Sequence, residues 1–195
     1  MRLIFRALLL FVVSVNAHAL TEGELQEGLV NPGYFGKPSW FKESFLDLRE
    51  DVAEAKASGK QLLLLFHQDG CPYCEKLLKV NFTQAEIVTK AQADFDVIEI
   101  NMWGDREIIG LSGEPMSEKL FAQQLQVQFT PTLIFLDQDA HITFRANGYY
   151  PPEKFLRLLN YLSSDINKAQ VSFNQYSDKS QNTPIKQYHY SLPYP

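Results

Sequence analysis

The sequence contains few cysteines, and the two that it has stand close together. Cys71 and Cys74 are the only cysteines among 195 residues. Secreted proteins that depend on disulfides for stability carry several cysteines at wide spacing. With 45 % hydrophobic residues, this chain can form a core without them. The pair therefore predicts redox chemistry, because a structural disulfide would close too small a loop to add much stability.

The sequence also offers little that favours a metal site. A structural zinc site needs about four ligands. His67 lies near Cys71, but no second cysteine pair accompanies them, and the other histidines show no ligand spacing. We therefore expect neither a metal nor another cofactor.

An excess of positive charge and a long internal apolar run are missing as well. Asp and Glu number 23 against 18 Lys and Arg, which gives a formal net charge of −5, and no Lys/Arg run occurs. A mildly acidic chain is a poor candidate for binding nucleic acid or an anionic membrane. Beyond the first 20 residues no stretch of about 20 apolar residues occurs, so no internal membrane span is expected.

Residues 1–19 have the layout of a secretory signal peptide. Arg2 and Arg6 form a basic start, an apolar segment runs from Ala7 to Val15, and Ala17-His18-Ala19 supplies the small residues of a cleavage site. The apolar segment is shorter than the roughly 20 residues of a membrane span, which favours a cleaved signal over an uncleaved anchor. We therefore expect export to the periplasm.

Hydrophobic spacing predicts an alternation of helices and strands. The expected helices cover residues 43–58, 71–80, 85–93, 117–125 and a final segment that begins at Pro152, and the expected strands cover 62–66, 95–100, 132–136 and 141–146. The last two strands are joined by a short turn and form a hairpin. This order predicts an α/β fold with a mixed central sheet of about four to five strands flanked by helices.

The composition divides the chain around one domain. We expect an irregular N-terminal arm over residues 20–42, the domain over 43–166, and a poorly ordered C-terminal tail over 167–195. In the first helix of the domain, Phe45 and Leu48 fall on the face that is expected to be buried.

The position of the two cysteines favours a reactive thiol. Cys71 follows a buried strand and precedes Pro72, which favours the first position of a helix. Unpaired N–H groups and the helix dipole at such a position lower the pKa of a thiol from about 8.5 to well below neutral. Cys74 lies one helical turn further on and faces the same side. Cys71 is therefore the expected exposed nucleophile, and Cys74 the thiol that resolves a mixed disulfide.

Residues 43–166 resemble the thioredoxin superfamily. The resemblance depends on the strand followed by Cys71-Pro72-Tyr73-Cys74 and on Phe129-Thr130-Pro131-Thr132 before a later strand. It implies a thioredoxin fold and a cis peptide bond before Pro131, close to Cys71. It also implies that the backbone of Thr130 pairs with an extended substrate peptide. The competing interpretation of Pro131 is an ordinary proline at the start of a strand.

Within the superfamily, the chain is similar to exported thioredoxins of the SoxW type, which are associated with bacterial sulfur oxidation. Asp69-Gly70 before the cysteine tetrad and the stretch Asn101–Glu107 carry this similarity. The segment 101–116 is longer than a compact thioredoxin needs, and its apolar residues indicate an ordered insertion with a short hairpin that turns at 112–115. Such an insertion either borders the dithiol and shapes partner choice, or serves as surface packing.

Two positions depart from the thioredoxin pattern. Gly70 stands where thioredoxins have a tryptophan, and Leu65 stands where they have a buried aspartate that helps to deprotonate the resolving thiol. Another proton acceptor is then needed. Glu99 is the preferred candidate, because apolar neighbours flank it and its spacing places it near the dithiol; Glu75 is a second candidate. A solvated acid on the face of the strand is the competing interpretation of Glu99.

Three functions remain open from the sequence. The first is a monomeric reductase of disulfides on exported proteins, supplied with electrons by a membrane thiol reductase. The second is an oxidase that introduces disulfides. The third is a non-catalytic binding or assembly module, against which the presence of both cysteines argues. The direction of exchange depends on the redox potential and the partner, and the resemblance alone favours reduction.

Overall fold

The computed structural model describes residues 36–164 and 172–181. The signal peptide that the sequence predicts over residues 1–19 lies outside the described residues, as does most of the expected N-terminal arm.

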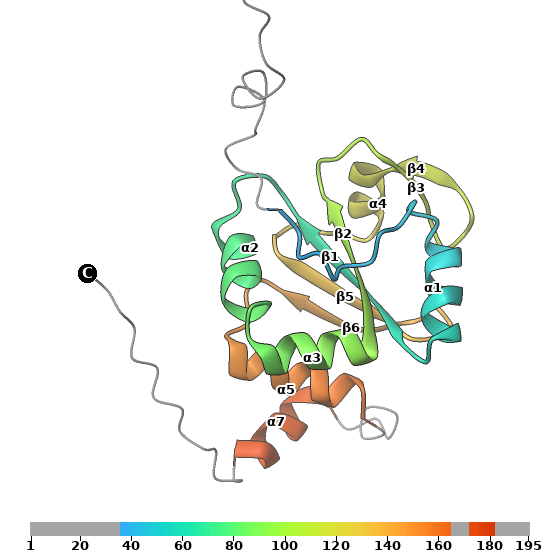
Figure 1. Ribbon diagram of the computed structural model, residues 1–195. Coiled ribbons are helices and arrows are strands. Elements are labelled where there is room, and N and C mark those ends of the chain that lie inside the picture. Colours follow the sequence, from blue (N-terminus) through green and yellow to red (C-terminus); the bar gives the residue numbers. More distant parts are fainter. Residues whose placement is uncertain (1–35, 165–171, 182–195) are drawn as a thin grey trace, which may run out of the picture. The chain divides into compact units, whose positions relative to one another are not determined.

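A mixed four-stranded sheet forms the centre of the domain (Figure 1). The inner strands are β1 (Gln61–His67) and β5 (Thr132–Leu136), which pair antiparallel. On the outer sides, β2 (Phe95–Asn101) pairs with β1 in parallel, and β6 (Ile142–Asn147) pairs with β5 antiparallel. Both inner strands carry continuous apolar runs because helices cover both faces of the sheet. The predicted class of fold is confirmed.

The helices divide between the two faces of the sheet (Figure 1). α3 (Ala85–Asp94) and α5 (Pro152–Leu162) cover one face, around a core that includes the fully buried Phe155. α1 (Leu48–Ala57) and α4 (Glu118–Gln124) cover the other face, where Phe121 stacks on Phe66. Each face therefore has its own apolar core, and β1 contributes to both.

The first helix begins later than the sequence predicts. Asp47 caps α1, its side chain accepting a hydrogen bond from the N–H of Arg49 at 3.1 Å. Leu46 has a φ of 64°, which no helical residue adopts. Because the helix cannot extend through these two residues, Phe45 does not join the buried face and is fully exposed. The expected burial of Phe45 is therefore wrong.

The segment of residues 101–116 is an ordered hairpin, as predicted. β3 (Glu107–Ile109) and β4 (Pro115–Ser117) pair antiparallel and form a separate two-stranded sheet. The N–H of Ile109 donates to the carbonyl oxygen of Leu46 at 2.9 Å, which ties the hairpin to the start of α1.

A helix lies within the segment that the sequence predicts to be a poorly ordered tail. α7 spans Phe173–Gln181, and Phe173 is 7 % exposed. Its ring lies 5.5 Å from that of Tyr161 on α5 and 5.7 Å from that of Phe144 on β6. Over these residues the prediction of a poorly packed tail is wrong. Tyr176 adds a second contact, its ring 5.4 Å from that of Tyr161, so two aromatic side chains hold this otherwise polar helix against the domain.

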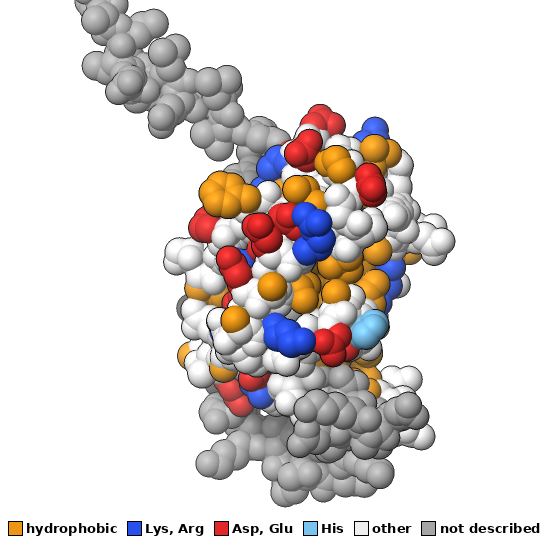
Figure 2. All heavy atoms as spheres, turned by 90° about the vertical axis from the view of Figure 1, so that its right-hand side faces the viewer, with side chains coloured by type: hydrophobic (Ala, Val, Ile, Leu, Met, Phe, Trp, Pro, Cys, Tyr) orange, Lys and Arg blue, Asp and Glu red, His pale blue; other side chains and the backbone are white. Residues whose placement is uncertain are grey.

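The surface on the α1 side carries mixed charge. Figure 2 shows acidic and basic side chains interspersed over this face, with apolar atoms between them. Lys56 and Asp139 form one of the exposed ion pairs, at 2.8 Å. Among the helices in the described ranges, none combines the length and apolar character that a membrane span requires.

Candidate active site

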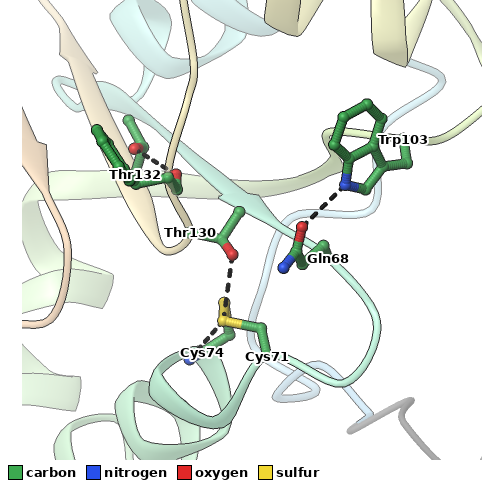
Figure 3. Close-up of a disulfide and its surroundings, with 7 residues drawn as sticks. Gln68, Cys71, Cys74, Trp103, Thr130 and Thr132 are labelled. Atoms are coloured by element: carbon green, nitrogen blue, oxygen red, sulfur yellow. Dashed lines mark hydrogen bonds between the residues drawn. A yellow bond between two sulfur atoms is a disulfide. The ribbon is translucent and has the colours of Figure 1, made fainter.

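Cys71 and Cys74 form a disulfide at the start of a helix (Figure 3). α2 (Pro72–Lys76) follows β1 after a short turn and continues as the π-helix η1 (Leu77–Asn81). Cys71 is the N-cap residue of α2, and its Sγ accepts a hydrogen bond from the N–H of Cys74 at 3.1 Å. Gly70 has a φ of 69°, which glycine adopts without strain and which turns the chain into the helix. The predicted helix start at Cys71 is confirmed.

Both cysteines are more buried than the sequence suggests. Cys71 is 4 % exposed and Cys74 is 7 % exposed. The expectation of an exposed Cys71 is therefore wrong for this oxidised form. The reason is tertiary, because Thr130 comes from a segment 59 residues away and its hydroxyl donates to Cys71 Sγ at 3.2 Å. Because so little of Cys71 is exposed, a partner protein must fit closely against the residues around Cys71 before its sulfur can reach Cys71 Sγ.

The peptide bond between Thr130 and Pro131 is cis, as the resemblance implies. The carbonyl oxygen of Pro131 accepts from the N–H of Gly148 at 2.8 Å, which fixes the segment to the end of β6. Within the described part of the chain, the backbone N–H and C=O of Thr130 have no hydrogen-bond partner. These groups are therefore available to an added strand beside Cys71.

Glu99 lies in the middle of β2, where it pairs in register with Leu65 of β1. Side chains of paired residues in parallel strands lie on the same face, so Glu99 shares the face of the position where thioredoxins carry their buried aspartate. Burial raises the pKa of the Glu99 carboxyl above its ordinary value, and the charges of Lys37 and Arg106 partly oppose this. The apolar flanks predicted for Glu99 are present, and a role in proton transfer stays a prediction.

Glu75, the second candidate, lies on the surface of α2. Its Oε1 forms an ion pair with Lys79 Nζ at 2.6 Å, one helical turn further along. The hydrogen bonds that the described residues make to Cys71 Sγ come from Cys74 and Thr130, and not from Glu75. A role for Glu75 in proton transfer also stays a prediction.

A tryptophan from the insertion reaches the loop before Cys71. Trp103 Nε1 donates to Gln68 Oε1 at 2.8 Å (Figure 3). The sequence indicates Trp103 only as part of an ordered insertion and gives no signal for Gln68. Since the two residues are 35 positions apart, no local pattern indicates that they meet.

A buried acid holds this tryptophan-bearing segment in place. Glu118, the first residue of α4, is 1 % exposed. Its Oε1 accepts from the backbone N–H of Asn101 at 3.0 Å and from Arg106 Nη2 at 2.6 Å. A Cβ at Gly104 would lie 2.0 Å from Glu118 Oε2, so any larger residue there would have to displace this buried carboxylate. Sequence reasoning missed Glu118, because an acid in the first turn of a helix is usually exposed.

Aromatic side chains also flank the site on the α2 side. Tyr73, between the two cysteines, is 58 % exposed, and its ring stacks on that of Tyr149 with centroids 6.4 Å apart. Lys76 Nζ lies 4.8 Å from the centroid of the Tyr149 ring. Sequence patterns indicate no role beyond packing for Tyr149.

His67, the residue near Cys71 that a metal site would use, is the last residue of β1. Burial lowers the pKa of its imidazole, and the charges of Glu118 and Asp69 partly oppose this. In the portion of the chain that the structure describes, no cluster of three or more His, Cys, Asp or Glu side chains is arranged to hold a metal.

A mixed four-stranded sheet with a C-x-x-C disulfide at the start of a helix, and a cis-proline beside it, defines a thioredoxin fold. The sequence model described as a thioredoxin-like domain matches residues 48–163. This match covers more than half of the chain, and the chain therefore belongs to the thioredoxin-like domain family. A search of curated proteins found no match for this chain.

A solved structure agrees with this assignment of the fold. A thioredoxin-fold protein from Helicobacter pylori is 25 % identical, with a TM-score of 0.56, over 63 % of this chain and 81 % of its own. A thioredoxin from Thermus thermophilus is 24 % identical, with a TM-score of 0.48, over 61 % of this chain and 85 % of its own.

Proposed function

We propose that this protein reduces disulfides of partner proteins by dithiol–disulfide exchange, with Cys71 as nucleophile and Cys74 as resolving thiol. The observation that carries the proposal is the Cys71–Cys74 disulfide at the start of α2, with the Thr130 hydroxyl bonded to Cys71 Sγ. The thioredoxin-like family and the free backbone of Thr130 support it.

The exchange proceeds in two displacements. The thiolate of reduced Cys71 attacks one sulfur of the partner's disulfide, whose S–S bond breaks, and the other partner sulfur leaves as a thiolate that takes up a proton. Cys74 then loses its proton and attacks Cys71 Sγ, which forms the Cys71–Cys74 disulfide and releases the second partner thiol. Two electrons pass to the partner, whose two sulfurs take up one proton that Cys74 has lost and one from water. A dithiol donor, which we propose to be a membrane thiol reductase, returns the protein to the reduced form.

The surroundings of Cys71 favour its role as the attacking sulfur. Cys71 Sγ accepts from the N–H of Cys74 and from the hydroxyl of Thr130. Hydrogen bonds to a sulfur stabilise its thiolate over its thiol. Because both donors converge on Cys71, its thiolate is stabilised for the first attack on the partner's disulfide.

Glu99 is the proposed acceptor of the Cys74 proton. Its place beside Leu65 and its partial burial support this role, because a carboxylate with a raised pKa is a stronger base near neutral pH. Glu99→Gln is then expected to slow resolution of the mixed disulfide about tenfold or more at pH 7. Glu75→Gln serves as the matched control. Equal resolution rates for the two variants across pH 6–9, measured by stopped flow, would contradict the role of Glu99.

The cellular setting is proposed from the sequence. Residues 1–19 support export to the periplasm, and Asp69-Gly70 with the stretch Asn101–Glu107 supports kinship with SoxW-type thioredoxins. Fractionation of cells that express the full chain, with mass spectrometry of its N-terminus, tests export. A full-length chain that stays in the cytoplasm would contradict it.

Measurement of the redox potential tests the direction of electron flow. After equilibration of the full protein in glutathione buffers, a Cys71–Cys74 potential of about −270 mV supports reduction, whereas about −120 mV supports the alternative, an oxidase. If no reversible titration of the two thiols occurs, the redox function itself is refuted and a binding module remains.

A trapping variant tests the two cysteine roles. Cys74→Ala is expected to accumulate mixed disulfides with partner proteins, because nothing attacks the bond to Cys71. Cys71→Ala is the matched control and is expected to accumulate few. Equal trapping by both variants would contradict the assignment of Cys71 as nucleophile.

A further inference from the structure

We propose that Trp103 determines substrate specificity at this site. Its indole contacts an apolar or aromatic side chain that lies next to the reactive cysteine of an extended partner segment. This inference rests on the proposed function, because it concerns the protein substrates of the same dithiol.

Trp103 is tied to the loop that leads into Cys71. Its indole N–H donates to Gln68 Oε1 at 2.8 Å, and Gln68 lies three residues before Cys71. The preceding N–H, that of Met102, donates to the carbonyl oxygen of His67 at 2.9 Å. Figure 3 shows the side chains of Trp103 and Gln68 pointing toward each other from two different loops. The insertion and the cysteine loop are therefore linked at two consecutive positions.

The free part of the indole is apolar. Trp103 is 56 % exposed, and its only polar atom is already bonded to Gln68. The surface that remains consists of ring carbons, which gain from contact with another apolar side chain. Lys119 Nζ lies 5.9 Å from the centroid of the ring and covers it only loosely. The indole therefore offers an apolar surface rather than a hydrogen bond.

The segment that presents the indole is rigidly built. The N–H of Trp103 donates to Asn101 Oδ1 at 3.0 Å, and the buried Glu118 holds the N–H of Asn101. Gly104 follows with no space for a Cβ against that carboxylate. A buried acid and the glycine that packs against it thus hold the segment that carries an exposed side chain. Such preorganisation lowers the entropy cost of binding, and surface packing alone would not require it.

The position before Cys71 leaves room for a partner chain. A Cβ at Gly70 would meet nothing within 4 Å. The hydroxyl of Thr130 contacts Cys71 Sγ, and the unpaired backbone of Thr130 can bind an extended chain. A segment that pairs with Thr130 and brings its cysteine to Cys71 passes next to Gly70, toward Gln68 and Trp103. Because the unpaired N–H and C=O of Thr130 can pair with a peptide backbone, they favour an extended protein segment over a small thiol compound.

Two disulfide-bridged peptides of equal ring size test this inference, one with Phe and one with Ser beside the attacked cysteine. We expect the pre-reduced full chain to favour the Phe peptide by about three- to tenfold in single-turnover kcat/KM, the range that aromatic contacts supply. Trp103→Ala is expected to bring this ratio close to one, and Trp103→Phe to retain most of it. Ile142→Ala, at an exposed apolar residue on β6, is the control and is expected to keep the ratio.

The outcomes separate the two proposals. If the wild-type protein reduces neither peptide, the proposed function fails. If it reduces both peptides equally, or if Trp103→Ala keeps the preference for Phe, the role of Trp103 is refuted and the reductase function stands.

Discussion

Gly104→Ala should destabilise the protein by displacing a buried carboxylate. The new methyl group would lie 2.0 Å from Glu118 Oε2 and 2.8 Å from Glu118 Cδ. Glu118 is 1 % exposed, so its side chain cannot move into solvent without giving up its partners. Those partners are the N–H of Asn101 at 3.0 Å and Arg106 Nη2 at 2.6 Å.

The size of the effect follows from these two hydrogen bonds. A hydrogen bond to a charged group contributes about 1.5–3 kcal/mol. Arg106 is half exposed, so water replaces part of what it loses. We therefore expect Gly104→Ala to lower the free energy of unfolding by about 2–4 kcal/mol.

Urea unfolding of the oxidised full chain, followed by far-UV circular dichroism, measures this loss. Gly36→Ala is the matched control, because a Cβ at Gly36 would meet nothing within 4 Å. Its effect should stay within about 0.5 kcal/mol. A double variant provides a second test. In Glu118→Ala the carboxylate beside Gly104 is gone, so adding Gly104→Ala to this variant should lower its free energy of unfolding only slightly.

Two results would refute this reasoning. One is a loss below about 0.5 kcal/mol for Gly104→Ala, which would mean that the Glu118 carboxylate rearranges freely. The other is an equal loss in the wild-type and Glu118→Ala backgrounds, which would mean that the methyl group and the carboxylate do not compete for the same space.

Two further predictions concern the core and the sheet. Phe155→Ala should lower the free energy of unfolding in urea by about 3–5 kcal/mol, because Phe155 is 0 % exposed and its ring lies 5.5 Å from that of Phe82. Phe45→Ala, at an exposed position, is the control and should lower it by less than about 0.5 kcal/mol. Similar losses for the two variants would contradict the assignment of Phe155 to the core. Burial raises the pKa of Glu99 in the folded state above its value of about 4.3 in the unfolded chain. The contribution of Glu99 to folding stability is therefore fully present below about pH 4.3 and is lost as the pH rises through the folded-state pKa. Glu99→Gln should therefore raise the urea midpoint at pH 7–8 and have little effect near pH 4, whereas a pH-independent change would contradict this.

Local patterns in the sequence were sufficient for the sheet and the dithiol. The continuous apolar run Leu62–Phe66 can bury the side chains on both of its faces only between two layers of helices, so it predicts an inner strand. Cys71 followed by Pro72 predicts a helix start, and the structure places it there. Such features depend on neighbours within one or two turns of chain, which the sequence displays directly.

Other features depended on contacts between distant residues. The burial of the Cys71–Cys74 pair arises in part from Thr130, and the docking of α7 arises from Phe173 against Tyr161. Hydrophobic spacing alone placed Phe45 in the first helix, whereas the backbone at Leu46 and the cap at Asp47 exclude it. A periodic pattern shows which residues are apolar, but it does not show where a capping side chain ends the helix.

The sequence by itself determined the order of strands and helices, and the two sulfur atoms that carry the chemistry. Only the tertiary structure decided what surrounds those atoms: the Thr130 hydroxyl, the indole of Trp103 bonded to Gln68, and the buried Glu118 that fixes this segment. The reason is physical. Elements form from local spacing, whereas the environment of a site is assembled from side chains that meet only after the sheet has brought distant segments together.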